Sequence, residues 1–169
     1  MKVILYMAIS VNGMIAKSDD NTSWITPEEW RSYSLFVRKA GNLIVGRRTY
    51  EILTKQPEFA EFKDIKLVVV SKKQDINLVS RKHLIAESPK KALTFLKNFK
   101  RIVVAGGGTL NNSFLEENLI DEIYLDVEPI IITTGIPLFK GKEFVKNLKF
   151  INQQKISENE IQLHYTIVK

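Results

Sequence analysis

The chain has 169 residues, of which 44% are hydrophobic, so it can bury a substantial core as one domain spanning residues 1–169. It contains no cysteine, which excludes disulfides, thiolate nucleophiles and zinc–cysteine clusters, and we expect no metal site. The formal net charge is +6, but the lysines are interleaved with acidic and apolar residues, so we expect neither nucleic acid nor a membrane as a partner. No apolar run is long enough for a membrane span, and we expect a cytoplasmic protein.

Short apolar runs alternate with amphipathic segments over the first 120 residues, which predicts alternating strands and helices. The segment 26–41 has the clearest helix signals, because Thr26 and Pro27 give an N-cap and a first-turn proline and Gly41 gives a stop. In chain order we expect strand 2–9, helix 26–41, strand 42–46, strand 66–71, helix 88–99, strand 101–106 and helix 109–118.

The last third of the chain contains strand patterns only. We expect strands over 122–132, 149–157 and 160–168, with the turn "SENE" joining the last two into an antiparallel hairpin. Strand–helix units followed by a hairpin predict an α/β fold with a central mixed, mainly parallel sheet flanked by helices. Such a sheet carries its cleft at the ends of its strands.

Three glycines, Gly106 to Gly108, lie between the apolar run "RIVVA" and the predicted helix 109–118. A glycine turn that opens a helix lets phosphate oxygens approach bare backbone N–H groups at the positive end of the helix dipole. A tight turn with close strand–helix packing explains the glycines equally well. The pattern is not the dinucleotide fingerprint of a Rossmann fold, because the third glycine and the acidic ribose clamp are missing.

The stretch "VGRRTYE" repeats this arrangement, with Gly46 at a strand end followed by Arg47, Arg48 and Thr49. Arginine forks and a hydroxyl at a helix start suit phosphate, although exposed arginines on a capped helix are the alternative. Two such junctions in one small sheet could hold the two ends of a dinucleotide diphosphate.

The stretch "SWITPEEW" places Glu28 and Glu29 in the first turn of the predicted helix 26–41. Acidic residues there often only complement the helix dipole. However, Glu29 shares one helix face with Tyr33 and Phe36, at spacings of four and seven residues. An inward-facing carboxylate needs a partner, so we interpret Glu29 as a candidate ligand-binding group.

Taken together, "SWITPEEW", "IVGRRTYE", "VVVS" and "VVAGGGTLNNSFL" resemble, in order and spacing, the dihydrofolate reductase superfamily over nearly the whole chain. The resemblance implies a dihydrofolate reductase-like sheet and NADPH as hydride donor. "MAISVNGMIA" and the region after the glycines are similar to the reductase domain of riboflavin biosynthesis. "WxxPxE" and "GRRTYE" are similar to true dihydrofolate reductases, and the Asp-Asp-Pro segment typical of riboflavin enzymes is missing.

The resemblance also implies roles for individual residues. Glu29 is expected to be the catalytic residue that grips the pterin ring. The other residues expected to contact the substrate are Ala8, Trp30, Tyr33 and Asp126. Asp126 replaces a threonine common in dihydrofolate reductases, and a second carboxylate in one pocket should raise one pKa. The residues expected to contact the cofactor are Ile15, on a mobile loop, and Gly46, Arg47, Arg48, Thr49, Ser71, Lys72, Gly106, Gly107, Gly108, Thr109 and Leu110.

The activity implied first is NADPH-dependent reduction of 7,8-dihydrofolate to tetrahydrofolate by hydride transfer, with Glu29 orienting the pterin. The arginine that holds the glutamyl tail in dihydrofolate reductases is missing, so Lys63 or Lys66 would have to take its place. The alternatives are a riboflavin-pathway pyrimidinone reductase, another pterin reductase, or a non-catalytic NADP-binding protein. The resemblance is compatible with a monomer or a homodimer.

Overall fold

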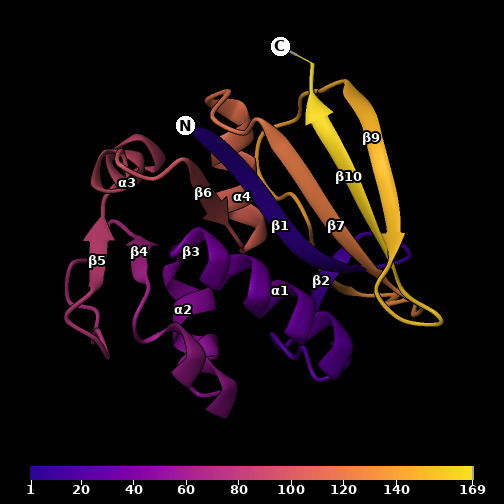
Figure 1. Cartoon of the computed structure of the whole chain (residues 1–169), viewed down its shortest axis with the longest axis horizontal. Coiled ribbons are helices and arrows are strands. Elements are labelled where there is room, and N and C mark those ends of the chain that lie inside the picture. Colours follow the sequence, from indigo (N-terminus) through magenta and orange to yellow (C-terminus); the bar gives the residue numbers. More distant parts are fainter. Residues whose placement is uncertain (169) are drawn as a thin grey trace.

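The computed structural model describes residues 1–168 and shows one large sheet with helices packed on it (Figure 1). The sheet has eight strands in the order β5-β4-β3-β6-β1-β7-β10-β9. In chain order these are β1 (Lys2–Ser10), β3 (Asn42–Gly46), β4 (Lys66–Val70), β5 (His83–Ala86), β6 (Arg101–Val104), β7 (Glu122–Glu128), β9 (Leu148–Lys155) and β10 (Ile161–Ile167). The strands from β5 to β7 pair in parallel, and β10 pairs antiparallel with β7 and β9. The mainly parallel sheet with a C-terminal hairpin is therefore confirmed.

The helices cover both faces of this sheet because the buried side chains of β1 alternate between two cores. Leu5 packs in the core that includes residues of α3 and α4, whereas Tyr6 packs in the core that includes residues of α1, α2 and η1. The helices are α1 (Pro27–Ala40), α2 (Arg47–Leu53), the 3₁₀ helix η1 (Pro57–Phe62), α3 (Pro89–Phe95) and α4 (Gly108–Glu116).

Helix α1 has the ends that its sequence predicts. The Thr26 hydroxyl accepts a hydrogen bond from the Glu29 backbone N–H at 3.1 Å, and Gly41 ends the helix with a φ of 72°. Helix α2 begins at Arg47, directly after Gly46, so that Thr49 lies within the helix rather than opening it. The N-terminus of α1 is thus fixed by its own cap, which matters for the position of Glu29.

Four details of the fold differ from the predictions. The strand expected over 122–132 ends at Glu128, because Pro129 has no N–H to continue the ladder. Helix α3 ends at Phe95, before 99. Strand β5 and the two-stranded sheet of β2 (Met14–Lys17) and β8 (Gly135–Pro137) were not predicted, because runs of three or four residues carry little pattern. Within residues 1–168 no helix is both long and apolar enough to cross a membrane.

Candidate active site

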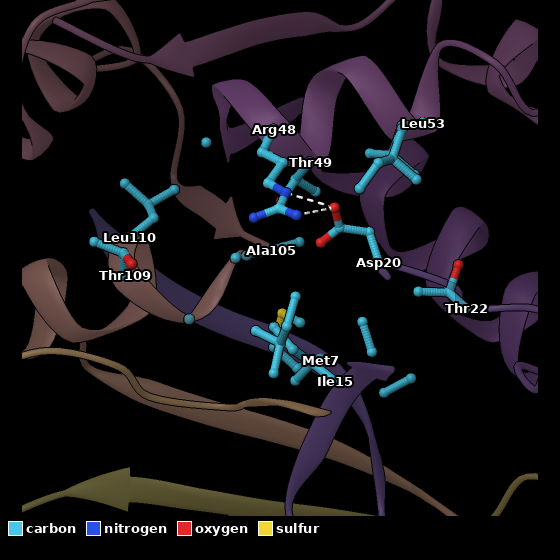
Figure 2. A pocket seen from close by; sticks show the side chains of 18 of the residues that line it. Met7, Ile15, Asp20, Thr22, Arg48, Thr49, Leu53, Ala105, Thr109 and Leu110 are labelled. Atoms are coloured by element: carbon cyan, nitrogen blue, oxygen red, sulfur yellow. Dashed lines mark hydrogen bonds and ion pairs between the residues drawn. The ribbon is translucent and has the colours of Figure 1, made fainter. Parts of the chain in front are cut away.

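A cleft of about 1380 Å³ lies where the parallel strands end. One wall comes from the segments that follow β3, β4 and β6, and the other from the loop before α1 and from α1 itself. Figure 2 shows Arg48 and Asp20 reaching toward each other in this cleft, opposite Met7 and Ile15. Its place at the carboxyl ends of the strands is where open α/β sheets bind their ligands.

The two glycine junctions meet directly in the first wall. The Gly46 N–H donates a hydrogen bond to the Gly106 carbonyl at 2.8 Å. Gly106 has a φ of 83°, which a residue with a side chain rarely adopts, and its N–H donates to the Asn111 side chain at 3.1 Å. The peptide bond between Gly106 and Gly107 is cis. The sequence predicted that both junctions serve one site, and the structure brings them together.

The glycines leave backbone open toward the cleft. A Cβ atom at Gly107 would lie 3.4 Å from the Thr49 hydroxyl, and one at Gly106 would lie 3.2 Å from the Met7 methyl carbon. No side chain caps the N-terminus of α4 or of α2. Free N–H groups at the positive end of a nine-residue helix, facing a threonine hydroxyl, suit the oxygens of a diphosphate. The chemistry of this wall therefore fits a dinucleotide.

The basic side chains of the same wall are partly engaged. Arg48 forms an ion pair with Asp20 across the cleft (Figure 2), and the Arg47 guanidinium contacts the Glu51 carboxylate at 2.7 Å along α2. Lys72 lines the cleft with no ion-pair partner among the described residues. An entering phosphate must therefore compete with two carboxylates for the arginines.

Glu29 provides the acidic counterpart on α1. Its side chain lines the cleft yet is only 3% exposed, and within residues 1–168 no hydrogen bond or ion pair reaches its carboxylate. Burial, and then the charges of Asp126, Glu128 and Glu160, raise the pKa of Glu29 well above its usual range. A buried carboxyl without a partner in an open cleft favours a ligand that donates hydrogen bonds to it.

Asp126 does not lie where the sequence predicted. It is 1% exposed and absent from the cleft lining, so the expectation of a direct substrate contact is wrong. It lies behind Tyr6, whose hydroxyl donates to its carboxylate at 2.6 Å, and Gln162 donates to its other oxygen at 2.7 Å. Burial raises the pKa of Asp126 to about 6 despite these two hydrogen bonds, with Glu128 and Glu160 adding to the effect. Asp126 acts on the site through Tyr6, which does line the cleft, and through its charge on Glu29.

Two further carboxyls, Glu128 and Glu160, lie buried at 1% and 4% exposure. Glu128 and Glu160 lie next to the paired residues Val127 and Ile161 and interact with each other, an arrangement that is unfavourable when both are charged. Burial, and then the proximity of Glu160, raise the pKa of Glu128. The Glu128 carboxylate also accepts hydrogen bonds from the Thr26 N–H at 3.0 Å and from its hydroxyl at 3.3 Å. Glu128 thereby ties the N-terminus of α1, and with it Glu29, to the sheet.

Aromatic side chains complete the wall around Glu29. The Tyr33 ring centroid lies 5.5 Å from that of Tyr6, 5.6 Å from that of Trp30 and 5.8 Å from that of Phe62. Burial raises the pKa of Tyr33, so its hydroxyl stays protonated. These rings, tilted against one another, form an apolar wall beside a carboxyl, which suits a planar heterocycle with donor groups on one edge.

Every residue predicted to contact the cofactor or the substrate ring lines one cleft, except Asp126. Ile15 was expected on a mobile loop, but it belongs to strand β2 and is 8% exposed. Lys63 and Lys66, expected to hold a glutamyl tail, do not line the cleft. The sequence did not predict four further residues that line the cleft or lie buried behind it. One of them, Glu128, could have been identified, because it follows Asp126 two residues later on the same face of one strand. These four are Tyr6, Asp20, Glu128 and Glu160.

This geometry agrees with the comparison to protein families. Residues 1–162 match the RibD C-terminal domain. The chain belongs to that family. The match extends over both glycine junctions, α1 and β9 and ends at the second residue of β10, so every part of the cleft lies within it. The suspected superfamily and its riboflavin-type features are therefore confirmed.

Similar proteins come from several bacteria. The chain is 31% identical to YwjB of Bacillus subtilis (strain 168) over 169 residues, which is 97% of each chain. A protein of Shewanella sp. PV-4 assigned to riboflavin biosynthesis has the same fold, with a TM-score of 0.82, 21% identity and 100% of each chain covered. Dihydrofolate reductase of Enterococcus faecalis, solved with NADP(H), superposes with a TM-score of 0.74 and 16% identity over 99% of this chain and 97% of the other. The dihydrofolate reductase-like fold is thus confirmed.

Proposed function

We propose that this protein is an NADPH-dependent reductase of a planar 2-amino-4-oxopyrimidine heterocycle, the ring shared by pterins and by pyrimidinone intermediates. The observation that carries the proposal is that a dinucleotide-sized wall of glycine turns and a buried carboxyl without a partner line the same cleft. When bound, the reduced nicotinamide supplies a hydride from its C4, which adds with a proton from water across a C=N bond of the substrate and leaves NADP⁺.

The wall of glycine turns would hold the cofactor. The backbone of Gly106 to Leu110 at the start of α4 would take the diphosphate, with Thr49 donating its hydroxyl from α2. Arg48 and Lys72 would take the 2′-phosphate of the adenosine end. Ala8 and Ile15, which line the cleft between the two ends, would keep water from the nicotinamide.

Glu29 would hold the substrate. Its ionised carboxylate would accept two hydrogen bonds, one from the exocyclic amine and one from the adjacent ring N–H of the heterocycle. Trp30 and Tyr33 would pack on the ring plane. A 2-oxo ring such as uracil does not present these two neighbouring donors, so Glu29 would select the 2-amino form. Its role is to orient the ring and raise the basicity of the reacting nitrogen, while water delivers the proton.

The family match supports a pyrimidinone, the ring class of the riboflavin-type relatives, as the substrate over dihydrofolate. Dihydrofolate remains a second candidate because Glu29 occupies the first turn of α1 with its carboxyl toward the cleft. Lys63 and Lys66, however, lie away from the cleft. We therefore place dihydrofolate second.

A direct test is the fall in NADPH absorbance when the purified protein is mixed with dihydropterin, with dihydrofolate and with a diaminopyrimidinone, each with and without an antifolate. A prompt decrease with one of them, blocked by the inhibitor, supports the proposal. NADPH binding without oxidation in the presence of any of them would contradict it and favour a non-catalytic NADP-binding protein.

A further inference from the structure

The cationic side chains that line the cleft are gathered at one of its ends. Arg47, Arg48, Lys72 and Lys140 belong to segments that follow β3 and β4 or lie against the start of α4. On the α1 side the lining includes one cation, Arg31. The basic end is the one that fits the cofactor phosphates, so it is not available to the substrate.

Arg31 shares its charge with a neighbouring carboxylate. Its guanidinium contacts the Glu28 carboxylate at 3.2 Å, one helical turn away, and its side chain is 74% exposed. Lys63 lies at the end of η1, and Lys66 is the first residue of β4, at the opposite end of the strand from the cleft-lining Ser71. No described cation near Glu29 is therefore both free and directed into the cleft.

Acidic groups dominate the α1 end instead. Glu29 and Glu58 line the cleft there, and Asp126, Glu128 and Glu160 lie buried behind it. One oxygen of Glu160 has no hydrogen-bond partner among the described residues. These side chains bring no positive charge to this end of the cleft, and each of them that ionises repels anions, so this end favours hydrogen-bond donors and cations.

From this distribution of charge we infer that the substrate is a 2-amino-4-oxo heterocycle without a phosphate or carboxylate group, that is, a free pterin or pyrimidinone with a neutral side chain. The inference rests on the proposed function in that it places the heterocycle against Glu29. It separates this protein from enzymes whose substrates carry a glutamyl tail or a ribose phosphate, because both groups would project from the ring toward a region with no receptor for them.

The test uses binding, so that it does not depend on turnover. Two pairs of ligands share a ring and differ in the presence of an anionic group: 6-hydroxymethylpterin against its phosphate ester, and the diamide of folate against folate. Dissociation constants are measured by fluorescence with the cofactor-loaded protein. We expect the neutral member of each pair to bind at least about tenfold more tightly, with the difference shrinking as salt is added. Equal or tighter binding of the charged members, or no binding of either pair, would overturn the inference.

A charge-reversal variant tests the cause of the selectivity. Glu58 lies on η1, beside α1, and lines the cleft, so Glu58→Lys should narrow the neutral-to-charged ratio severalfold for both pairs. Glu143→Lys is the matched control, since Glu143 is exposed and lies outside the cleft lining while the net charge changes equally. If the ratio of neutral-ligand to charged-ligand affinity changes equally in both variants, the selectivity does not come from the charge of Glu58 at the cleft. If the neutral ligands bind selectively but neither dihydropterin, dihydrofolate nor a diaminopyrimidinone oxidises NADPH, the proposed function is refuted and this inference stands.

Discussion

Replacing Glu29 with glutamine tests the role of the buried carboxyl most directly. The side chain keeps its length and shape, so the packing beside Tyr33 and Trp30 is preserved. The amide offers one acceptor where the carboxylate offers two, and its NH₂ group faces a donor of the heterocycle. The variant therefore loses one of the two hydrogen bonds and gains an unfavourable contact between two donors. The hydrogen bond that remains has a neutral acceptor instead of a charged one.

The size of the effect follows from the isolation of Glu29. Because the carboxyl is 3% exposed, water cannot replace the lost hydrogen bonds. Hydrogen bonds to charged groups are worth about 1.5–3 kcal/mol each, so the variant should lose roughly 2–4 kcal/mol of transition-state binding. This corresponds to a decrease in kcat/KM of roughly 30- to 1000-fold. Stability at neutral pH should not fall, because the substitution removes an unpaired acid from a buried site beside Asp126, Glu128 and Glu160.

The assay combines steady-state turnover of the preferred substrate, NADPH affinity by fluorescence and the free energy of unfolding by urea. We expect the loss in kcat/KM with the dissociation constant of NADPH unchanged within about twofold, since Glu29 lies on α1 and the glycine turns lie on α2 and α4. Glu28→Gln, in the same helical turn but exposed, is the matched control and should behave like the natural protein. An equal loss of NADPH affinity, or unchanged turnover, would refute the assigned role.

Three further predictions follow from the same region. The folded protein raises the pKa of Asp126 from 3.8 to about 6, so the contribution of Asp126 to the free energy of unfolding is present below pH 3.8 and is lost as the pH rises through about 6. In urea titrations Asp126→Asn should remove about 3 kcal/mol of this pH dependence. Burial lowers the pKa of His83 and gives the opposite pH dependence, which is the same in both proteins and cancels when they are compared. Asp20→Asn should tighten NADPH binding up to about fivefold by freeing Arg48, and weaker binding would contradict competition for that arginine. Gly107→Ala should weaken NADPH binding at least about tenfold, because the new methyl group occupies the space proposed for the diphosphate. The unfolding temperature should not fall, because a φ of −78° suits alanine. Unaltered NADPH affinity would show that the diphosphate does not bind at Gly107.

The parallel sheet and α1 could be predicted from the sequence because their signals are local. Apolar runs of three to seven residues mark the central strands, and Thr26 with Pro27 at one end and Gly41 at the other mark α1. Strand β5 was hidden because His83 reads as a surface residue. In the fold its ring is 2% exposed and contacts the Tyr50 hydroxyl at 2.9 Å, a contact between residues 33 positions apart. Such a partner supplies the hydrogen bond that burial demands, and no local pattern announces it.

The candidate site divides in the same way. The glycine turns and Glu29 could be predicted because each lies in a short run of consecutive residues with a recognisable pattern. The position of Asp126 was not, since alternation along β7 gives the face of the sheet on which a residue lies but not what covers it. Tyr6 covers it, and its hydroxyl also contacts Ser32 at 2.9 Å, so that β1 and α1 together close the space that Asp126 was expected to share with a ligand.

The buried carboxyls explain how the C-terminal hairpin takes part in a site that it does not line. The pairing of β10 with β7 brings Glu160 beside Glu128. The Glu128 carboxylate accepts hydrogen bonds from the backbone N–H and the hydroxyl of Thr26. Thr26 in turn caps the helix turn that carries Glu29. Neighbouring acids are costly for folding, and the Glu128–Thr26 hydrogen bonds offset only part of that cost. These carboxyls lower the stability of the fold, but they fix the position of Glu29 and make its end of the cleft acidic. A binding site for a neutral heterocycle that donates hydrogen bonds requires both effects.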